Sequence, residues 1–184
     1  MGRFAPPEIV AAALSNATAV EPLIAAMWPH CYRVAAAIIG EPRLAEDAAQ
    51  EACACVYRSL RRIREPAAFD GWVYRIVVRE ATRIARRHRT PPTAAPPPTT
   101  LCGGDDDASL DLWRALALLP PDLRAVVILF YFDDLPGDAI ARILRVSPVT
   151  VRTRLARARQ RLRGMLADDL DLPSTAWETA THAS

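Results

Sequence analysis

Apolar residues recur at steps of three and four through most of the chain, which predicts amphipathic α-helices. The clearest runs are residues 44–60 and 69–89, and Gly40 and Pro42 punctuate the chain just before the first of them. Alternating β-branched residues bounded by turn residues, the usual sign of a strand, are missing. The pattern therefore predicts an all-α fold.

One segment interrupts this pattern. Residues 90–109 read TPPTAAPPPTTLCGGDDDAS, and the prolines in it favour an extended spacer over a helix. The 184 residues are thus expected to form two small helical domains, each large enough to bury a core. The expected parts are a first domain at 1–90, a flexible Pro-rich acidic linker at 91–109, a second domain at 110–167 and an acidic tail at 168–184.

The net charge of +2 conceals a strong segregation of charge along the chain. Residues 58–90 carry ten basic residues against three acids, and residues 139–163 carry eight basic residues and no acid. All 23 basic residues are Arg, whose planar guanidinium pairs with phosphates and base edges. Two basic blocks separated by acidic ones indicate two nucleic-acid contacts, although solvated helix faces would give the same pattern.

The first basic block holds a helix with an arginine face. Five arginines recur there at three- and four-residue steps, in front of an apolar stripe. They are Arg75, Arg79, Arg83, Arg86 and Arg87. Trp72 and Tyr74 stand near the helix start, so this face fits a helix that follows phosphates and presents rings to bases. An ordinary Arg-rich surface helix is the alternative.

The second basic block reads as a helix-turn-helix. A short helix at 138–144 precedes a tight turn, and Ser147 can cap a second helix that has Pro148 at its first position. Exposed Thr and Arg near the start of that second helix suit entry into the major groove of DNA. A helical hairpin with a basic exterior is the alternative.

No arrangement of residues predicts a metal site, a cofactor or a catalytic group. Cys53 and Cys55 point to different sides of a helix, and the three His are far apart in the sequence. No stretch reaches the ~18 uninterrupted apolar residues of a transmembrane helix, and the N-terminus does not resemble a signal peptide. We expect a cytoplasmic protein that is not an enzyme and does not insert into a membrane.

Three stretches, taken in order, resemble the sigma-70 family, and within it the bacterial group IV or extracytoplasmic-function (ECF) sigma factors. Residues 45–60 (AEDAAQEACACVYRSL) resemble the helix of region 2.2, residues 69–89 (FDGWVYRIVVREATRIARRHR) resemble that of regions 2.3 and 2.4, and residues 117–159 resemble region 4. Arg145 stands where the family's turn commonly has Gly, so we expect backbone strain or a shifted turn there.

The resemblance implies a sigma factor that binds core RNA polymerase, through the β′ clamp and β flap regions, and directs promoter recognition and DNA melting. The residues it assigns to the β′ clamp are Glu46, Asp47, Gln50, Glu51 and Arg58. Those assigned to the single-stranded −10 element are Trp72, Tyr74, Arg75, Arg79, Arg83 and Arg86. Those assigned to the duplex −35 element are Thr150, Arg152, Thr153, Arg154 and Arg157. An anti-sigma factor is a further candidate partner.

Two other classes of protein stay open. One is a stand-alone regulator that binds duplex DNA through the helix-turn-helix, and the other is an anti-sigma-type or other helical interaction protein with no DNA role. The basic, aromatic helix at 69–89 favours a sigma factor over the first, because a duplex-only regulator has no use for a single-strand reader. The segregated arginines argue against the second.

Overall fold

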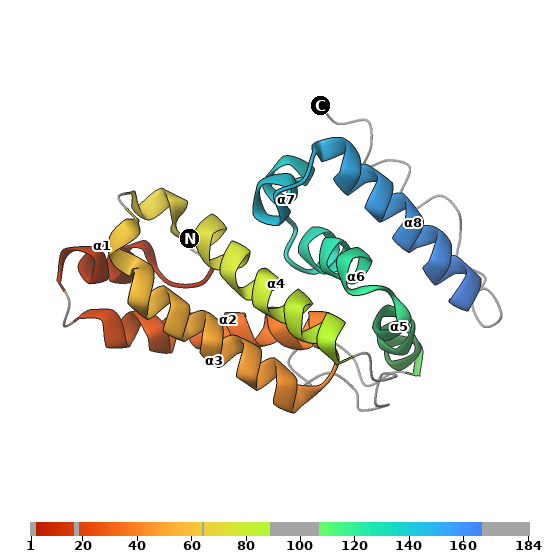
Figure 1. The fold of residues 1–184 in the computed structure, drawn as a ribbon, viewed down its shortest axis with the longest axis horizontal. Helices are drawn as coiled ribbons and strands as arrows, with labels where there is room; N and C mark the ends of the chain where they lie inside the picture. The colour runs from red at the N-terminus through yellow and green to blue at the C-terminus, as the bar shows by residue number, and fades with distance from the viewer. Residues whose placement is uncertain (1–2, 17–18, 64, 89–106, 167–184) are drawn as a thin grey trace.

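The computed structural model describes residues 3–16, 19–63, 65–88 and 107–166, and within these ranges every regular element is helical, which confirms the predicted all-α class (Figure 1). The elements are α1 (Pro7–Ser15), α2 (Val20–Ile39), α3 (Pro42–Ser59), 3-10 turns at Leu60–Arg62 and Pro66–Ala68, α4 (Phe69–Arg87), α5 (Asp107–Leu118), α6 (Pro121–Val127), a π-helical turn at Ile128–Phe132, α7 (Gly137–Leu144) and α8 (Pro148–Leu166). α5 begins inside the predicted linker. The rest of that linker and the acidic tail lie outside the described residues.

In the N-terminal half, α2, α3 and α4 pack on one another as a three-helix bundle, with α1 beside α2 (Figure 1). Leu23 and Met27 of α2 and Val73 and Val77 of α4 are fully buried between them.

α2 is also long and apolar enough to cross a membrane, with a mean hydropathy of 1.2 over its best window. Half of that window is buried inside the protein, as expected for the central helix of a bundle.

Local sequence sets the turn between α2 and α3. Gly40 ends α2 in the left-handed region at φ 79°, which costs a residue without Cβ little. The Glu41 carboxylate then accepts hydrogen bonds from the backbone N–H groups of Arg43 and Leu44 at 3.0 and 2.8 Å, and Pro42 occupies the first helical position. These contacts fix the angle at which α3 returns along α2.

In the C-terminal half, α7 and α8 form the predicted helix-turn-helix. The Ser147 hydroxyl accepts a hydrogen bond from the Thr150 N–H at 3.1 Å, and Pro148 opens α8, as expected. Arg145 adopts the left-handed conformation at φ 55°, which costs a non-glycine residue about 1 kcal/mol. The expected backbone strain at this turn is confirmed.

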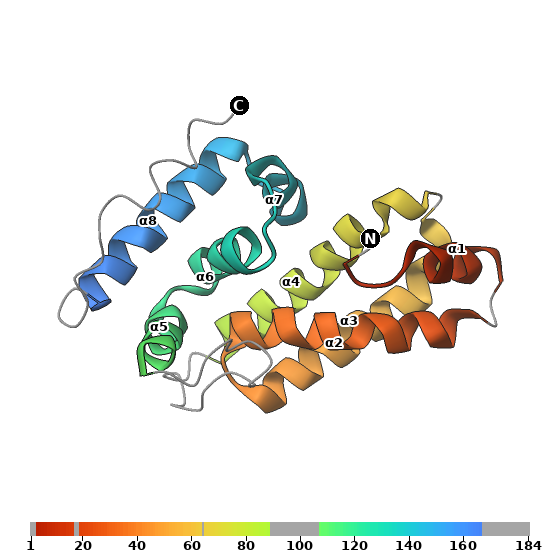
Figure 2. The same cartoon turned by 180° about the vertical axis from the view of Figure 1, so that it is seen from behind.

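The two halves pack directly against each other, which the sequence did not indicate. α4 contacts α6 and α7, and α2 contacts α6 and the π-helical turn (Figure 2). The arginine-bearing helix of the first half therefore lies next to the helix-turn-helix of the second.

A buried arginine holds this junction together. Arg124 of α6 is 6% exposed, and its guanidinium donates to the carbonyls of Ile38 and Ile39 at the end of α2, at 2.8 and 3.2 Å. It also donates to Leu119 O at 2.9 Å and to Ala117 O. Burial lowers the pKa of Arg124 to about 10, so the group is still charged at neutral pH.

A second polar cluster lies where Asp133, which follows the π-helical turn, meets the bundle. The Asp133 carboxylate lies 3.6 Å from His30 Nε2 and 3.8 Å from the Arg33 guanidinium. Burial, with a smaller contribution from Arg33, lowers the pKa of His30 to about 4, so that ring is neutral at pH 7 and its contact with Asp133 is not an ion pair. Burial raises the pKa of Asp133 to about 6, against the opposing effect of Arg33.

Truncation of Arg124 should separate its role from that of a surface arginine. We expect Arg124→Ala to lower the free energy of unfolding by about 2–4 kcal/mol, because buried carbonyls lose a charged donor. The matched control is Arg114→Ala on α5, whose exposed pair with Asp111 should contribute less than about 1 kcal/mol. Urea unfolding measures both, and equal losses would contradict the role assigned to Arg124.

The Asp133 cluster predicts opposite pH effects for two variants. The raised pKa of Asp133 stabilises the folded state at low pH, and this contribution is lost as pH rises towards 6. The lowered pKa of His30 destabilises the folded state at low pH, because the unfolded chain binds a proton more readily there. This destabilisation disappears as pH rises from 4 to 6.5. Relative to the unmodified chain, Asp133→Asn should therefore gain roughly 1–3 kcal/mol between pH 4 and 6, whereas His30→Gln should lose stability over the same interval. Urea titrations at both pH values test this, and a shift of the same sign in both variants would refute it.

Candidate nucleic-acid interface

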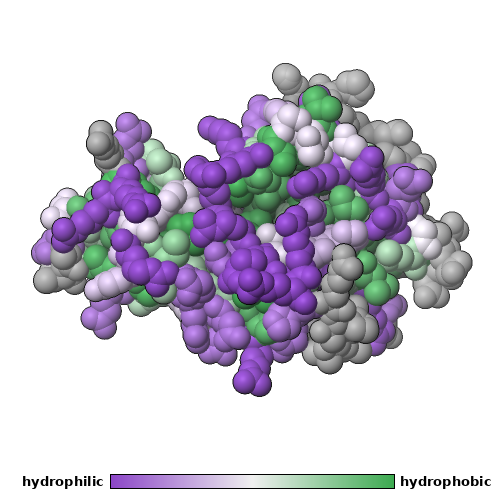
Figure 3. Space-filling model, in the orientation of Figure 1, coloured by the Kyte–Doolittle hydropathy of each residue, from purple (hydrophilic) through white to green (hydrophobic). Residues whose placement is uncertain are grey.

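The arginine face of α4 lies beside the junction between the halves. Hydrophilic side chains crowd over α4 on the side of the molecule seen in Figure 3. Apolar positions of the same helix, such as Val73 and Ile84, face the bundle core. The amphipathic pattern read from the sequence thus matches the orientation of the helix.

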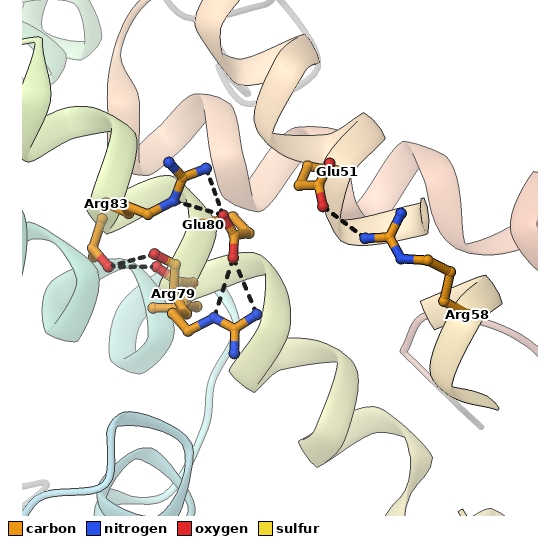
Figure 4. Close-up of polar contacts among 7 residues, drawn as sticks. Glu51, Arg58, Arg79, Glu80 and Arg83 are labelled. Atoms are coloured by element: carbon orange, nitrogen blue, oxygen red, sulfur yellow. Dashed lines mark hydrogen bonds and ion pairs between the residues drawn. The ribbon is translucent and has the colours of Figure 1, made fainter. Parts of the chain in front are cut away.

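One carboxylate holds two of the predicted arginines. Glu80 has a side chain only 10% exposed, and it accepts from Arg79 Nε at 3.1 Å and from Arg83 Nε at 2.8 Å (Figure 4). Each guanidinium also brings an Nη2 atom within 3.1 Å of the same carboxylate. The pairing orients both arginines along α4 and neutralises part of their charge.

A third arginine of this face pairs across the junction. Arg86 donates to both oxygens of Asp122 in α6, at 2.6 and 2.8 Å. The two side chains are 61% and 37% exposed, so the pair contributes little to stability. It does occupy a group that was expected to contact DNA.

Arginines of both halves line one cleft of about 330 Å³ between α4 and the helix-turn-helix. From α4 come Arg75, Arg79 and Arg86, together with Trp72. From the other side come Arg145 and Arg154, together with Asp122, Leu144 and Val146. The structure therefore brings four of the predicted −10 residues and one of the predicted −35 residues to the same cavity.

Tyr74 does not line this cleft with those four predicted −10 residues. Its ring is 1% exposed and packs edge-on against Phe4 at 4.6 Å, and its hydroxyl lies 3.0 Å from His30 Nε2. A base could reach this ring only if the core opened. This placement argues against the base contact expected for Tyr74 and makes the residue part of the bundle core.

The residues assigned to the polymerase clamp share the outer face of α3, where Glu46, Asp47, Gln50, Glu51 and Arg58 are all exposed. Glu51 accepts from Arg58 at 2.8 Å (Figure 4), and the Gln50 amide donates to Glu46 at 3.3 Å. Four of the five are therefore held in two pairs on this exposed face, which also carries Asp47.

The residues assigned to duplex DNA lie in the first turns of α8. Arg152, Thr153 and Arg157 are exposed, whereas Thr150 and Arg154 are half-buried. The Thr150 hydroxyl is 2.8 Å from that of Ser147, and the Thr153 hydroxyl donates to Val149 O at 2.9 Å. The start of α8 is thus accessible on one side, and Arg154 is turned towards α4.

Sequence reasoning missed three residues that shape this surface: Glu80, Asp122 and Arg124. The spacing of Glu80, three residues before Arg83, could have indicated that pair, because residues three apart meet on a helix, whereas adjacent residues such as Arg79 and Glu80 do not normally face each other. No local pattern indicates the other two, because their partners are 36 and about 85 residues away in the sequence.

These features define a helical protein with a three-helix bundle and a helix-turn-helix, each bearing an arginine-rich surface. Residues 23–90 match the family model of sigma-70 region 2, and residues 109–162 match that of sigma-70 region 4. The chain therefore belongs to the sigma-70 family, among its ECF members.

Two relatives show the extent of this similarity. The ECF RNA polymerase sigma factor SigE of Mycolicibacterium smegmatis is 36% identical over 149 residues, which cover 74% of this chain and 57% of that protein. The RNA polymerase sigma factor SigV of Bacillus subtilis is 30% identical over 141 residues, which cover 75% of this chain and 85% of that protein. This chain therefore spans little more than half the length of SigE but most of SigV.

Solved structures share the fold at lower identity. The sigma factor RpoE of Bartonella quintana, in complex with the anti-sigma factor NepR, superimposes with a TM-score of 0.63 at 22% identity, over 78% of this chain and 93% of RpoE. CnrH, in complex with the cytosolic domain of CnrY, superimposes with a TM-score of 0.66 at 20% identity, over 89% of this chain and 98% of CnrH.

The pair between Arg86 and Asp122 yields a direct test of the α4 surface. We expect Asp122→Ala to bind a labelled single-stranded oligonucleotide about three- to tenfold more tightly, with a steeper salt dependence, because Arg86 becomes available to phosphates. Fluorescence anisotropy at two salt concentrations measures this. Asp111→Ala removes the same charge from an exposed pair on α5 and should change the affinity less. Equal gains in both variants would show an effect of net charge alone.

Proposed function

We propose that this protein binds core RNA polymerase and directs it to promoters whose −10 and −35 elements are recognised by α4 and α8. The observation that carries the proposal is the match to sigma-70 regions 2 and 4, in that order, on a bundle and a helix-turn-helix that each bear an arginine-rich surface. The protein then acts in the cytoplasm and contributes no catalytic group, because the polymerase performs the chemistry.

Each role is assigned to one helix. The outer face of α3 docks on the β′ clamp, through Glu46, Asp47, Gln50, Glu51 and Arg58. The α4 face takes up the unpaired −10 strand, through Trp72, Arg75, Arg79, Arg83 and Arg86. The first turns of α8 read the −35 duplex, through Thr150, Arg152, Thr153, Arg154 and Arg157. Trapping unstacked bases on rings and guanidinium groups offsets the cost of melting, and phosphate and base-edge contacts at α8 set the register.

The packing of the two halves adds a condition for promoter binding. Because α4 and the start of α8 line the same cleft, the halves must separate before strand and duplex can both bind. An anti-sigma factor that holds the halves together is a further proposed partner, since the RpoE of similar fold was solved with one.

Run-off transcription with core polymerase from a high-GC bacterium tests the proposal. We expect protein-dependent initiation at discrete sites of genomic templates. Asp47→Arg should weaken core binding about tenfold or more, because it reverses an exposed charge on the α3 surface. Glu8→Arg makes the same change on an exposed residue of α1 and should leave core binding within about twofold.

A second experiment measures binding to promoter DNA. Arg152→Gln should preserve core binding but weaken binding to the selected −35 duplex about tenfold, since one guanidinium contact to a base is worth about 1–3 kcal/mol. Tight binding of the chain alone to some duplex, with neither core binding nor initiation, would instead identify a stand-alone regulator.

A further inference from the structure

The cleft between α4 and the helix-turn-helix has the dimensions of a small-molecule site. Its volume of about 330 Å³ lies at the lower end of the range for ligand pockets. Side chains from both halves form its walls, so a duplex cannot enter while the halves stay packed. We call the arrangement with the two halves packed together closed, and one with the halves separated open. A ligand that fits this cleft would therefore bind the closed arrangement and not the open one.

The charges around the cleft are unbalanced. Five arginines line it, whereas Asp122 is its one acid among the described residues, and Arg86 already pairs with that acid. No carboxylate of the described residues pairs with Arg75, Arg145 or Arg154. Bringing these cations together costs electrostatic energy, and an anion placed between them would relieve it.

Arg75 gives a second, independent observation. Its Nε atom is buried without a hydrogen-bond partner in the described structure, as are Arg124 Nε and Asp133 Oδ2, but of these three residues only Arg75 lines the cleft. A buried N–H donor without an acceptor is rare in folded proteins, and an acceptor that enters the cleft can pair with this one once the Arg75 side chain rotates towards it. A phosphate oxygen has both the charge and the lone pairs for this.

The remaining walls favour a ligand with an apolar part. The Trp72 ring, with Leu144 and Val146, lines the cleft beside the arginines. An indole face can stack on a nucleobase while the guanidinium groups hold phosphates. The arrangement combines the two kinds of contact that a nucleotide needs.

We propose that this cleft binds a small diphosphate-bearing ligand, held by Arg75 of α4 and by Arg145 and Arg154 of the helix-turn-helix. Because the arginines come from both halves, the bound diphosphate links them and favours the closed arrangement. If the proposed function is correct, such a ligand opposes promoter binding, since it occupies residues assigned to both promoter elements.

Titration calorimetry on the full chain tests the site, with ionic strength held constant. Inorganic pyrophosphate should bind at one site at least about tenfold more tightly than sulfate, because it offers more charged oxygens to the arginines. Arg75→Gln and Arg154→Gln should each weaken pyrophosphate binding about tenfold. The matched controls remove one exposed arginine from the same helices outside the cleft: Arg87→Gln on α4 and Arg161→Gln on α8. They should change binding less than about twofold.

ADP distinguishes the source of the diphosphate. Tighter binding of ADP than of pyrophosphate, with the difference lost in Trp72→Ala, would identify a nucleotide, and equal binding would identify an inorganic diphosphate. Both support the site. Controls that weaken binding as much as Arg75→Gln and Arg154→Gln, or binding of a single-stranded oligonucleotide without any binding of pyrophosphate, would overturn it. Circular dichroism checks that each variant is folded.

The consequence for promoter binding needs its own measurement. Pyrophosphate should displace a labelled single-stranded oligonucleotide from the unmodified chain, and a tenfold higher concentration should be needed with Arg154→Gln. Calorimetry detects the ligand without polymerase or DNA, so a failure of the sigma activity in run-off transcription would leave the binding result standing.

Discussion

The arrangement of the two halves depends on the burial of one charge. A guanidinium removed from water must find acceptors in the protein, and Arg124 finds them in carbonyls at the end of α2 and just before α6. The hydrogen bonds of its two Nη atoms fix α6 against α2, while its Nε is buried without a partner in the described structure. Since α7 follows α6 through a single π-helical turn, the same contact places the helix-turn-helix beside α4. The shared cleft and the pair between Arg86 and Asp122 follow from this position.

Features set by neighbours in the sequence could be predicted from the sequence. The helical spacing gave α3, α4 and α8, and Ser147 and Pro148 gave the start of α8, because each depends on residues within one or two turns. The strain at Arg145 was expected from the family resemblance instead, because the family's turn commonly has Gly there and a left-handed turn is unfavourable for a residue with a Cβ. Of the candidate site, the five residues of α3 and three of the five on α8 are exposed, whereas Thr150 and Arg154 are half-buried.

Features that join distant segments could not be predicted in this way. The spacing puts Tyr74 on α4, but whether its ring meets water depends on Phe4 and His30, which are 70 and 44 residues away. Likewise, an arginine in an apolar helix does not reveal which carbonyls will surround it. The direct packing of the two halves was missed for the same reason, because the Pro-rich segment between them suggested separation.

Counting arginines also overstates the positive charge that α4 offers to DNA. Glu80 holds Arg79 and Arg83, and Asp122 holds Arg86, so three of the five arginines on this helix face are paired in the closed arrangement. The two acids differ in what opening would do to them. Glu80 belongs to α4 itself and stays with its partners when the halves separate, whereas Asp122 belongs to α6 and leaves with the second half. Opening therefore exposes the cleft and releases Arg86 in the same step, which couples the availability of the α4 surface to the separation of the halves.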